Sequence, residues 1–272
     1  MDHEFMDDLV TMPPAALDEL LRQTEMERRD VEHRLAMIAA VAEQRSQFLA
    51  DGHASMTAYL KAHVNCSGAT ANRIRRRARL LDRHPAVLFF HGGSRRQMLL
   101  GFHHRGYYHG AYAMNQLLAN AGYVVLSVNY RSGIGYGMEF REALGYGATG
   151  ASEFNDVMGA GLYLQGRSDV DPERIGLWGG SYGGYLTAMG LARASDLFKA
   201  GVDLHGVHDW NVVMNGFRPE YEPEDYPDVS RSAYESSPMA FLDGWRSPGL
   251  VMHGDDVRNV PFSESVELAE GL

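Results

Sequence analysis

Apolar residues recur at two different spacings along the chain, and the change falls near Pro85. Before it, glycine is scarce and apolar residues repeat every three or four positions through residues 17–42. This spacing is typical of amphipathic helices. A glycine break precedes a second helical stretch at 56–64, and Ser67 or Thr70 can cap a third helix. The pattern predicts a helical domain over residues 1–84.

After Pro85, short apolar runs alternate with segments of helical spacing. Alternation of this kind is typical of a parallel sheet whose strands are joined by crossover helices. We therefore predict an α/β domain over residues 85–272. Its predicted strands are residues 86–91, 123–130, 174–179, 200–206 and 248–254.

Composition places the chain among ordinary globular proteins, with 272 residues, 45% hydrophobic and 22% charged. The net charge of −10 argues against a protein that binds nucleic acid or an anionic membrane over its whole surface. Cys66 is the only cysteine, so no intramolecular disulfide can form. The acidic N-terminus lacks the pattern of a signal peptide, and no apolar run approaches 18 residues. We expect a cytoplasmic protein without a membrane partner, cofactor or metal.

Six arginines crowd into the predicted helix that ends near Arg83, starting at Arg73. Guanidinium groups bind phosphate, so a helix of this kind can contact nucleic acid. The alternative is a solvated helix face that docks on the acidic remainder of the chain. The segment DGHASMTAYLKAHVNCSGATANRIRRRARLLDRHP resembles a helical domain of unknown function that often precedes HNH nuclease domains. That likeness, over residues 15–85, implies only a helical, DNA-associated module and no catalytic residue.

A serine lies between glycines in the sequence GGSYG, residues 179–183, directly after an apolar run and before a helical segment. This fits G-x-S-x-G, the nucleophile elbow, in which small flanking residues allow a sharp turn from strand to helix. The first unpaired N–H groups of the following helix favour a developing oxyanion. The motif predicts Ser181 as a nucleophile, and a tight turn that happens to contain serine is the alternative.

The first predicted strand ends in HGGS, residues 91–94. A glycine pair at this place supplies an oxyanion donor in the α/β-hydrolase fold, so Gly92 and Gly93 are the predicted oxyanion loop. The backbone N–H of Tyr182, directly after the nucleophile, is the predicted second donor. We interpret His91 as a loop residue, because it lies on the wrong strand to be the base.

From residue 85 onward, the chain resembles the catalytic domain of the prolyl oligopeptidase family of serine peptidases. The likeness rests on LFFHGGSRRQML, GYVVLSVNYRSGIGYG, DVDPERIGLWGGSYGGYLTAMGLAR and VMHGDDVRNVPFSESVEL. It implies an α/β-hydrolase fold with Ser181 as nucleophile and a peptide or small ester as substrate. The predicted strands would be the third to seventh of eight. The last of them, near Leu250 to His253, would be an exposed edge that invites self-association.

The chain departs from the family pattern at the other two members of the triad. The family carries its aspartate four residues before the proline of D-x-x-V-P, and this position is Val257. Asp256, next to it, is a candidate substitute acid. The triad histidine should follow, yet the last histidine is His253. His205, His208 and His253 lie near strand ends and are candidate substitutes for the base. The alternative, which we favour, is that each satisfies a local hydrogen bond.

Three functions therefore stay open from the residues. The chain is a serine peptidase or esterase acting through Ser181, an inactive or fragmentary hydrolase fold without its triad, or a DNA-associated module whose function lies in residues 15–85.

Overall fold

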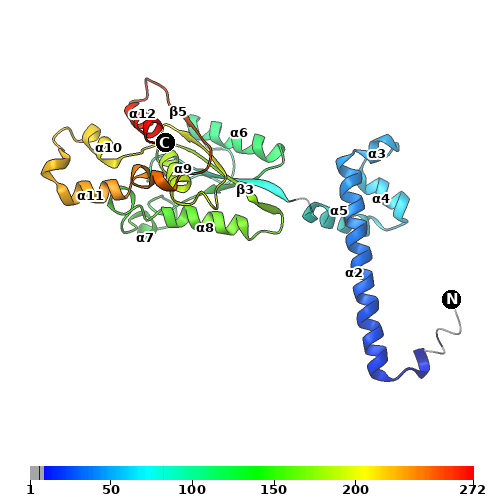
Figure 1. Ribbon diagram of the computed structural model, residues 1–272. Helices are drawn as coiled ribbons and strands as arrows, with labels where there is room; N and C mark the ends of the chain where they lie inside the picture. The colour runs from blue at the N-terminus through cyan, green and yellow to red at the C-terminus, as the bar shows by residue number, and fades with distance from the viewer. Residues whose placement is uncertain (1–5, 7–8, 82) are drawn as a thin grey trace. The chain divides into compact units, whose positions relative to one another are not determined.

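The computed structural model describes residues 6, 9–81 and 83–272, which separate into two compact units, 1–83 and 84–272 (Figure 1). Each unit has its own apolar core, so each is described by itself. The first unit is helical, as the sequence predicts. Its helices are α2 Pro14–Gln44, α3 Gln47–Ala50, α4 Met56–Val64 and α5 Gly68–Leu81.

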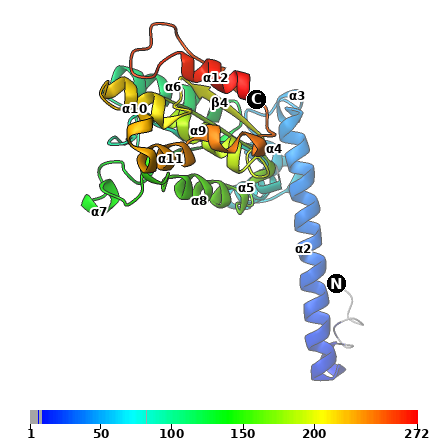
Figure 2. The same ribbon diagram turned by 60° about the vertical axis from the view of Figure 1, so that its left-hand side comes forward.

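The core of the first unit lies where α2, α4 and α5 meet. Ala39, Leu60 and Ala71 are buried there, one from each helix. The hydroxyl of Ser67 accepts the N–H of Thr70 at 3.1 Å, so Ser67 is the residue that caps α5. Figure 2 shows that α2 continues as one long helix well beyond this cluster.

The second unit contains a parallel five-stranded sheet of order β2-β1-β3-β4-β5. This confirms the predicted α/β fold. In chain order its elements are β1 His84–Phe90, α6 Gly106–Asn120, β2 Val124–Val128, α7 Met138–Arg141, η1 Gly147–Thr149, α8 Phe154–Gln165, β3 Val170–Gly180, α9 Tyr182–Arg193, β4 Ala200–Leu204, α10 Trp210–Phe217, η2 Pro223–Asp225, α11 Pro227–Glu235, η3 Pro238–Gly244, β5 Gly249–Met252 and α12 Ser263–Gly271.

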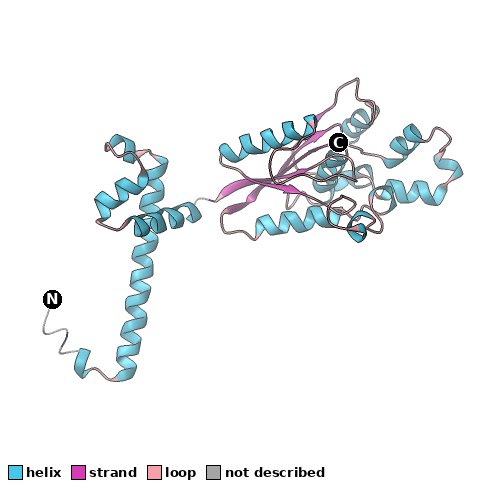
Figure 3. Cartoon of the chain, turned by 180° about the vertical axis from the view of Figure 1, so that it is seen from behind, coloured by secondary structure: helices cyan, strands magenta, loops and turns pink. Residues whose placement is uncertain are grey.

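Helices cover both faces of the sheet (Figure 3). The side chains at the end of β1 alternate between the two faces. Leu88 and Phe90 pack into the large core with α8 and α9. Phe89, between them in sequence, packs with Tyr108 and Ala111 of α6. Successive side chains of a strand point to opposite faces, so a continuous apolar run is what a strand buried on both faces requires.

Each of the five predicted runs forms a strand, with boundaries that differ by a few residues. The largest difference is at β3, which begins at Val170 because Val170 pairs with His84 ahead of an irregularity in the β1 register. The acidic segment 218–230, which reads as a surface loop in the sequence, contains η2 and the start of α11. The outer strands are β2 and β5.

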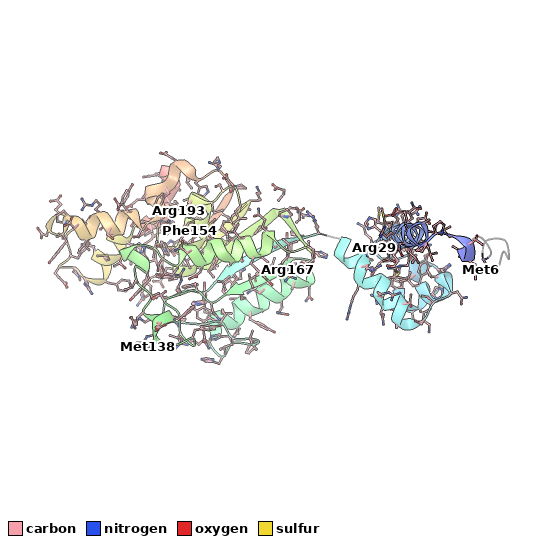
Figure 4. All side chains as sticks on the ribbon, turned by 90° about the horizontal axis from the view of Figure 1, so that it is seen from below. Met6, Arg29, Met138, Phe154, Arg167 and Arg193 are labelled. Atoms are coloured by element: carbon pink, nitrogen blue, oxygen red, sulfur yellow. The ribbon has the colours of Figure 1, made fainter. Side chains whose placement is uncertain are left out.

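A cation stacked on aromatic rings joins the end of α9 to neighbouring elements. The guanidinium of Arg193 lies 4.2 Å from the ring centre of Phe154 and 4.6 Å from that of Phe241 (Figure 4). Such contacts stabilise by about 1 kcal/mol. None of the helices in the described part of the chain is long and apolar enough to cross a membrane.

The approach of α9 to β1 leaves no space for a side chain at Gly183. A Cβ there would lie 2.0 Å from the carbonyl oxygen of Phe90, a backbone atom of β1 that cannot move without displacing the strand. We predict that Gly183→Ala lowers the free energy of unfolding of this unit by about 3 kcal/mol or more. All three tryptophans lie in residues 84–272, so tryptophan fluorescence during urea unfolding measures this unit alone.

Gly159 provides the matched control, because it is also helical and nothing lies within 4 Å of its added Cβ. Gly159→Ala should leave the unit as stable or raise its stability by about 0.5–1 kcal/mol. Equal stabilities of the two variants would contradict the close approach of α9 to β1.

Candidate active site

Ser181 occupies the sharp turn between β3 and α9, with φ 57° and ψ −119°. A non-glycine residue at positive φ is strained, and surrounding contacts must hold it there. Two backbone hydrogen bonds do so. The N–H of Ser181 donates to Leu204 at 2.9 Å, and its carbonyl accepts from the N–H of Tyr185 at 2.9 Å. Within the described residues, its hydroxyl has no hydrogen-bond partner and is free to react.

The glycines around Ser181 are there because backbone crowds this turn. A Cβ on Gly179 would lie 2.5 Å from the carbonyl oxygen of Gly183. Strand, serine and helix therefore form the geometry that the G-x-S-x-G motif predicts.

The loop after β1 packs directly against the elbow. A Cβ on Gly92 would lie 3.3 Å from the Cβ of Ser181 and 2.9 Å from the carbonyl oxygen of Gly180. Gly93, which follows, has φ +58°. The structure thus brings Gly92, one of the two predicted oxyanion-loop residues, beside Ser181, the predicted nucleophile.

Two tyrosine hydroxyls hold this loop in place. Tyr108 donates to the carbonyl of Gly92 at 3.0 Å, and Tyr130 donates to the carbonyl of His91 at 2.7 Å. The ring of His91 stacks on Tyr130 with 4.4 Å between centres. Burial, together with the charge of Arg96, lowers the pKa of His91 to about 4, so its ring is neutral at pH 7. His91 is thus packed as part of the loop.

Tyr182 is held by a buried carboxylate that belongs to no sequence motif. Its hydroxyl donates to Glu153, which also accepts from the hydroxyl of Ser132 at 2.9 Å and the N–H of Gly147 at 3.1 Å. Burial, with the nearby charge of Glu153, raises the pKa of Tyr182 well above its ordinary value. The first turn of α9 is therefore held from a distant segment.

The candidate acids lie apart from the histidines. Val257, at the family's aspartate position, is half-buried and packs against the apolar core. Asp256 is exposed and lies 3.8 Å from the guanidinium of Arg258. Among the described residues, no hydrogen bond joins Asp256 to a histidine.

The three candidate histidines differ in their partners. His253 is satisfied, because its Nε2 donates to the carbonyl of Val260 at 3.2 Å and its Nδ1 accepts from Ser265 at 2.7 Å. His205 directly follows Leu204, the residue bonded to Ser181, and its buried Nδ1 is unpaired. The ring of His205 lies close to the turn, because a Cβ added at Gly180 would be 3.5 Å from Cε1 of His205. Burial lowers the pKa of His205, which favours a neutral ring able to accept a proton.

His208 belongs to a buried network. Its Nε2 lies 2.6 Å from a carboxylate oxygen of Asp203 and its Nδ1 2.9 Å from the carbonyl of Glu264. Because both partners are acceptors, both ring nitrogens donate only when the ring is protonated. Burial opposes that charge, but Asp203 outweighs it and the pKa of His208 is raised. This network joins β4 to α12.

One group of residues in the described part of the chain has the types and spacing to hold a metal ion. His63 and His53 lie with their Nε2 atoms 2.7 and 3.3 Å from Asp51, in the helical unit.

Comparison with known proteins identifies related chains. A model of the prolyl oligopeptidase family matches residues 110–272. Dipeptidyl aminopeptidase BIII of Pseudoxanthomonas mexicana is 30% identical over 200 residues, covering 69% of this chain and 27% of that protein. The mouse acylamino-acid-releasing enzyme is 26% identical over 202 residues, covering 69% of this chain and 26% of that enzyme.

Solved structures agree with this likeness. The uncomplexed acylaminoacyl peptidase of Pyrococcus horikoshii superposes with a TM-score of 0.58 and 29% identity, covering 70% of this chain and 31% of that one. The chain therefore spans about a quarter to a third of the length of these relatives.

The buried network predicts how stability changes with pH. Burial raises the pKa of Glu264 from its ordinary value of 4.5 to about 7, so the folded state binds a proton that the unfolded state releases. A carboxyl group whose pKa is raised by folding makes the folded state more stable at low pH than at high pH. This stabilisation is lost as the pH rises from about 4.5 to 7. Between pH 4.5 and 8, the free energy of unfolding of the wild-type chain should fall by about 3 kcal/mol more than that of Glu264→Gln.

Urea unfolding followed by tryptophan fluorescence across this pH range measures the difference. Glu267→Gln, on the exposed side of the same helix, should follow the wild type. Parallel curves for wild type and Glu264→Gln would rule out a protonated Glu264 in the folded chain.

Proposed function

Because the chain belongs to the prolyl oligopeptidase family, we propose that it is a serine hydrolase that cleaves peptide or ester bonds through an acyl-enzyme on Ser181. The observation that carries this proposal is the backbone of Ser181, held at φ 57° and ψ −119° against Gly92. Strain of this kind persists only where surrounding contacts impose it, and it exposes the hydroxyl at the head of a helix.

In this proposal, the Ser181 hydroxyl attacks the carbonyl carbon of the substrate and forms a tetrahedral intermediate. Its oxyanion would accept hydrogen bonds from the N–H of Tyr182 and from the loop at Gly92 and Gly93. Collapse expels an amine or alcohol and leaves the acyl group on Ser181, and water then releases the acid.

We propose His205 as the group that accepts the serine proton. Its support is its position directly after Leu204, whose carbonyl accepts the N–H of Ser181, together with an unpaired buried Nδ1 and a lowered pKa that keeps the ring neutral. The same ring would return the proton to the leaving group. No carboxylate is assigned to orient the ring, so turnover should be slow beside that of a complete triad.

The inactive hydrolase fold is the alternative, and Val257 is the observation that favours it. Valine can neither orient an imidazole nor stabilise its charge. The two proposals differ in the reactivity of Ser181, because the elbow of an inactive fold would not form a covalent adduct there.

Labelling with a fluorophosphonate probe tests the proposal, because the probe reacts with an activated serine. We expect labelling of the wild-type chain and a loss of at least tenfold in Ser181→Ala. Ser168→Ala, an exposed serine in a loop, is the control and should label normally. A wild type that labels no faster than Ser181→Ala would establish the inactive alternative.

The pH dependence of labelling tests His205. The wild-type rate should rise with pH and reach half of its plateau value below pH 6.5, because burial lowers the pKa of His205 from that value. His205→Gln should slow labelling about tenfold or more and remove this step. His253→Gln should change the rate much less, and equal effects of the two variants would remove His205 from the mechanism.

The nucleic-acid alternative has weaker support. Arg75 contacts Glu43 at 2.7 Å, and Arg77 is paired with Glu32, both within the helical unit. These ion pairs favour the interpretation of α5 as a face docked on acidic neighbours. A role with DNA and a cytoplasmic location stay predictions from the sequence.

We also propose that the chain associates with itself through β5. In the sheet order, β5 pairs with β4 alone, and Leu250 and Met252 on it are more than half exposed. Unpaired strand edges with apolar side chains attract further strands. Sedimentation velocity should detect oligomers whose fraction grows with concentration.

Leu250→Lys should shift that distribution to the monomer, because lysine on an edge strand discourages pairing. Leu162→Lys is the control, since Leu162 is 54% exposed on α8 and Leu250 is 55% exposed. A monodisperse wild-type monomer at every concentration would disprove association through this edge.

A further inference from the structure

A cavity of about 540 Å³ adjoins the predicted oxyanion loop. Gly93 is part of its wall, and so is Tyr108, whose hydroxyl donates to the carbonyl of Gly92 at 3.0 Å. Gly92 packs on Ser181 and Gly93, the next residue, lines the cavity, so the cavity adjoins the loop that lies beside Ser181. A substrate attacked by Ser181 would have a group within reach of it.

The wall of this cavity is strongly basic. It carries three guanidinium groups and two imidazoles, on Arg95, Arg96, Arg105, His103 and His104, and no carboxylate is among its lining residues. In a chain with a net charge of −10, the three guanidinium groups make this wall a local positive patch. Positive clefts raise the local concentration of anions.

Two of the three arginines are left without a neutralising partner. Arg95 contacts Glu142 at 2.9 Å. Neither Arg96 nor Arg105 forms an ion pair with any residue that the structure describes. Their charges are therefore available to a ligand.

Arg96 is the best positioned of the three. It is half-buried, and its guanidinium lies 5.7 Å from the ring centre of Tyr108. Its Nε is 2.8 Å from the place where a Cβ on Gly93 would be, so the side chain lies along the oxyanion loop. Its charge also lowers the pKa of nearby His91, as expected of an uncompensated cation.

His103 completes the wall as a neutral group. Its Nδ1 accepts the backbone N–H of Arg105 at 3.0 Å and its Nε2 donates to the carbonyl of Gln97 at 3.3 Å. These bonds fix the loop that carries Arg105. The arginines, and not the histidine, supply the donors for a ligand.

We propose that this pocket binds a carboxylate of the substrate, so that the chain prefers acidic peptides. The proposal rests on the function proposed above, because it assigns the pocket to the substrate of Ser181. A planar guanidinium binds a carboxylate through two parallel hydrogen bonds, and Arg96 would provide them. The carboxylate can be the C-terminal one of a short peptide or the side chain of an aspartate or glutamate.

Binding to the Ser181→Ala chain tests the pocket without any chemistry. Fluorescence anisotropy would compare four labelled peptides of one length: an all-alanine peptide with a C-terminal carboxylate, the same peptide as an amide, and amidated peptides with aspartate or asparagine. At low salt, we expect the peptide with the preferred carboxylate to bind about tenfold more tightly than the neutral peptide paired with it, which is the amide or the asparagine peptide. The preference should decrease as salt is added, because salt screens charges.

The preferred acid identifies the source of the carboxylate. Tighter binding of the free C-terminus assigns the α-carboxylate, and tighter binding of the aspartate peptide assigns the side chain. Equal affinities for acids and their neutral matches would overturn the proposal.

Arg96→Gln should remove the preference, and Arg96→Lys should restore part of it because the charge returns without the planar fork. Arg246→Gln is the control, since Arg246 is exposed and paired with Asp196 at another place. Circular dichroism checks that each variant folds. An acid preference that survives in Arg96→Gln would assign binding elsewhere.

The two proposals can fail separately. If wild type shows no labelling at Ser181 while the acid preference persists, the pocket stands as a binding site and the hydrolase proposal falls. If labelling occurs without any acid preference, the hydrolase stands and this pocket does not select substrates.

Discussion

The candidate site depends on the close contact between the backbone of the elbow and the end of β1. Gly183 faces the carbonyl of Phe90, and Gly92 faces Ser181, without space for a side chain at either glycine. These contacts force the strand to turn sharply and leave the serine at positive φ. The proposed oxyanion loop and Ser181 are therefore positioned by the same crowded backbone, before any side chain contributes.

Side chains buried around this contact add rigidity. Tyr108 and Tyr130 hold the loop from one direction, and Glu153 holds Tyr182 from another. Buried polar groups of this kind are costly when unpaired, so a network that pairs them favours a single arrangement. In the proposed mechanism, the groups that would hold the acyl intermediate are thus better ordered than those that would move the proton, since Val257 stands where the family carries an aspartate.

Local patterns predicted the fold well. The five strands and the elbow each have a signal within a few residues, from apolar runs and from glycines around Ser181. The same is not true of Glu153, which belongs to no motif and acts only because folding brings it to Tyr182. Nor could the sequence separate His205 from His208, since the carbonyl bound by Nδ1 of His208 belongs to Glu264, far along the chain, while Nδ1 of His205 is unpaired. Contacts between distant segments are what the sequence alone could not supply.

The central claim is that Ser181 is a reactive nucleophile beside a formed oxyanion loop. A crystal structure of the chain after treatment with a sulfonyl fluoride tests it directly. We predict a sulfonyl group bonded to the hydroxyl oxygen of Ser181, with one sulfonyl oxygen within hydrogen-bond distance of the backbone N–H of Tyr182. An unmodified Ser181 after treatment with excess reagent would contradict a reactive serine at this position.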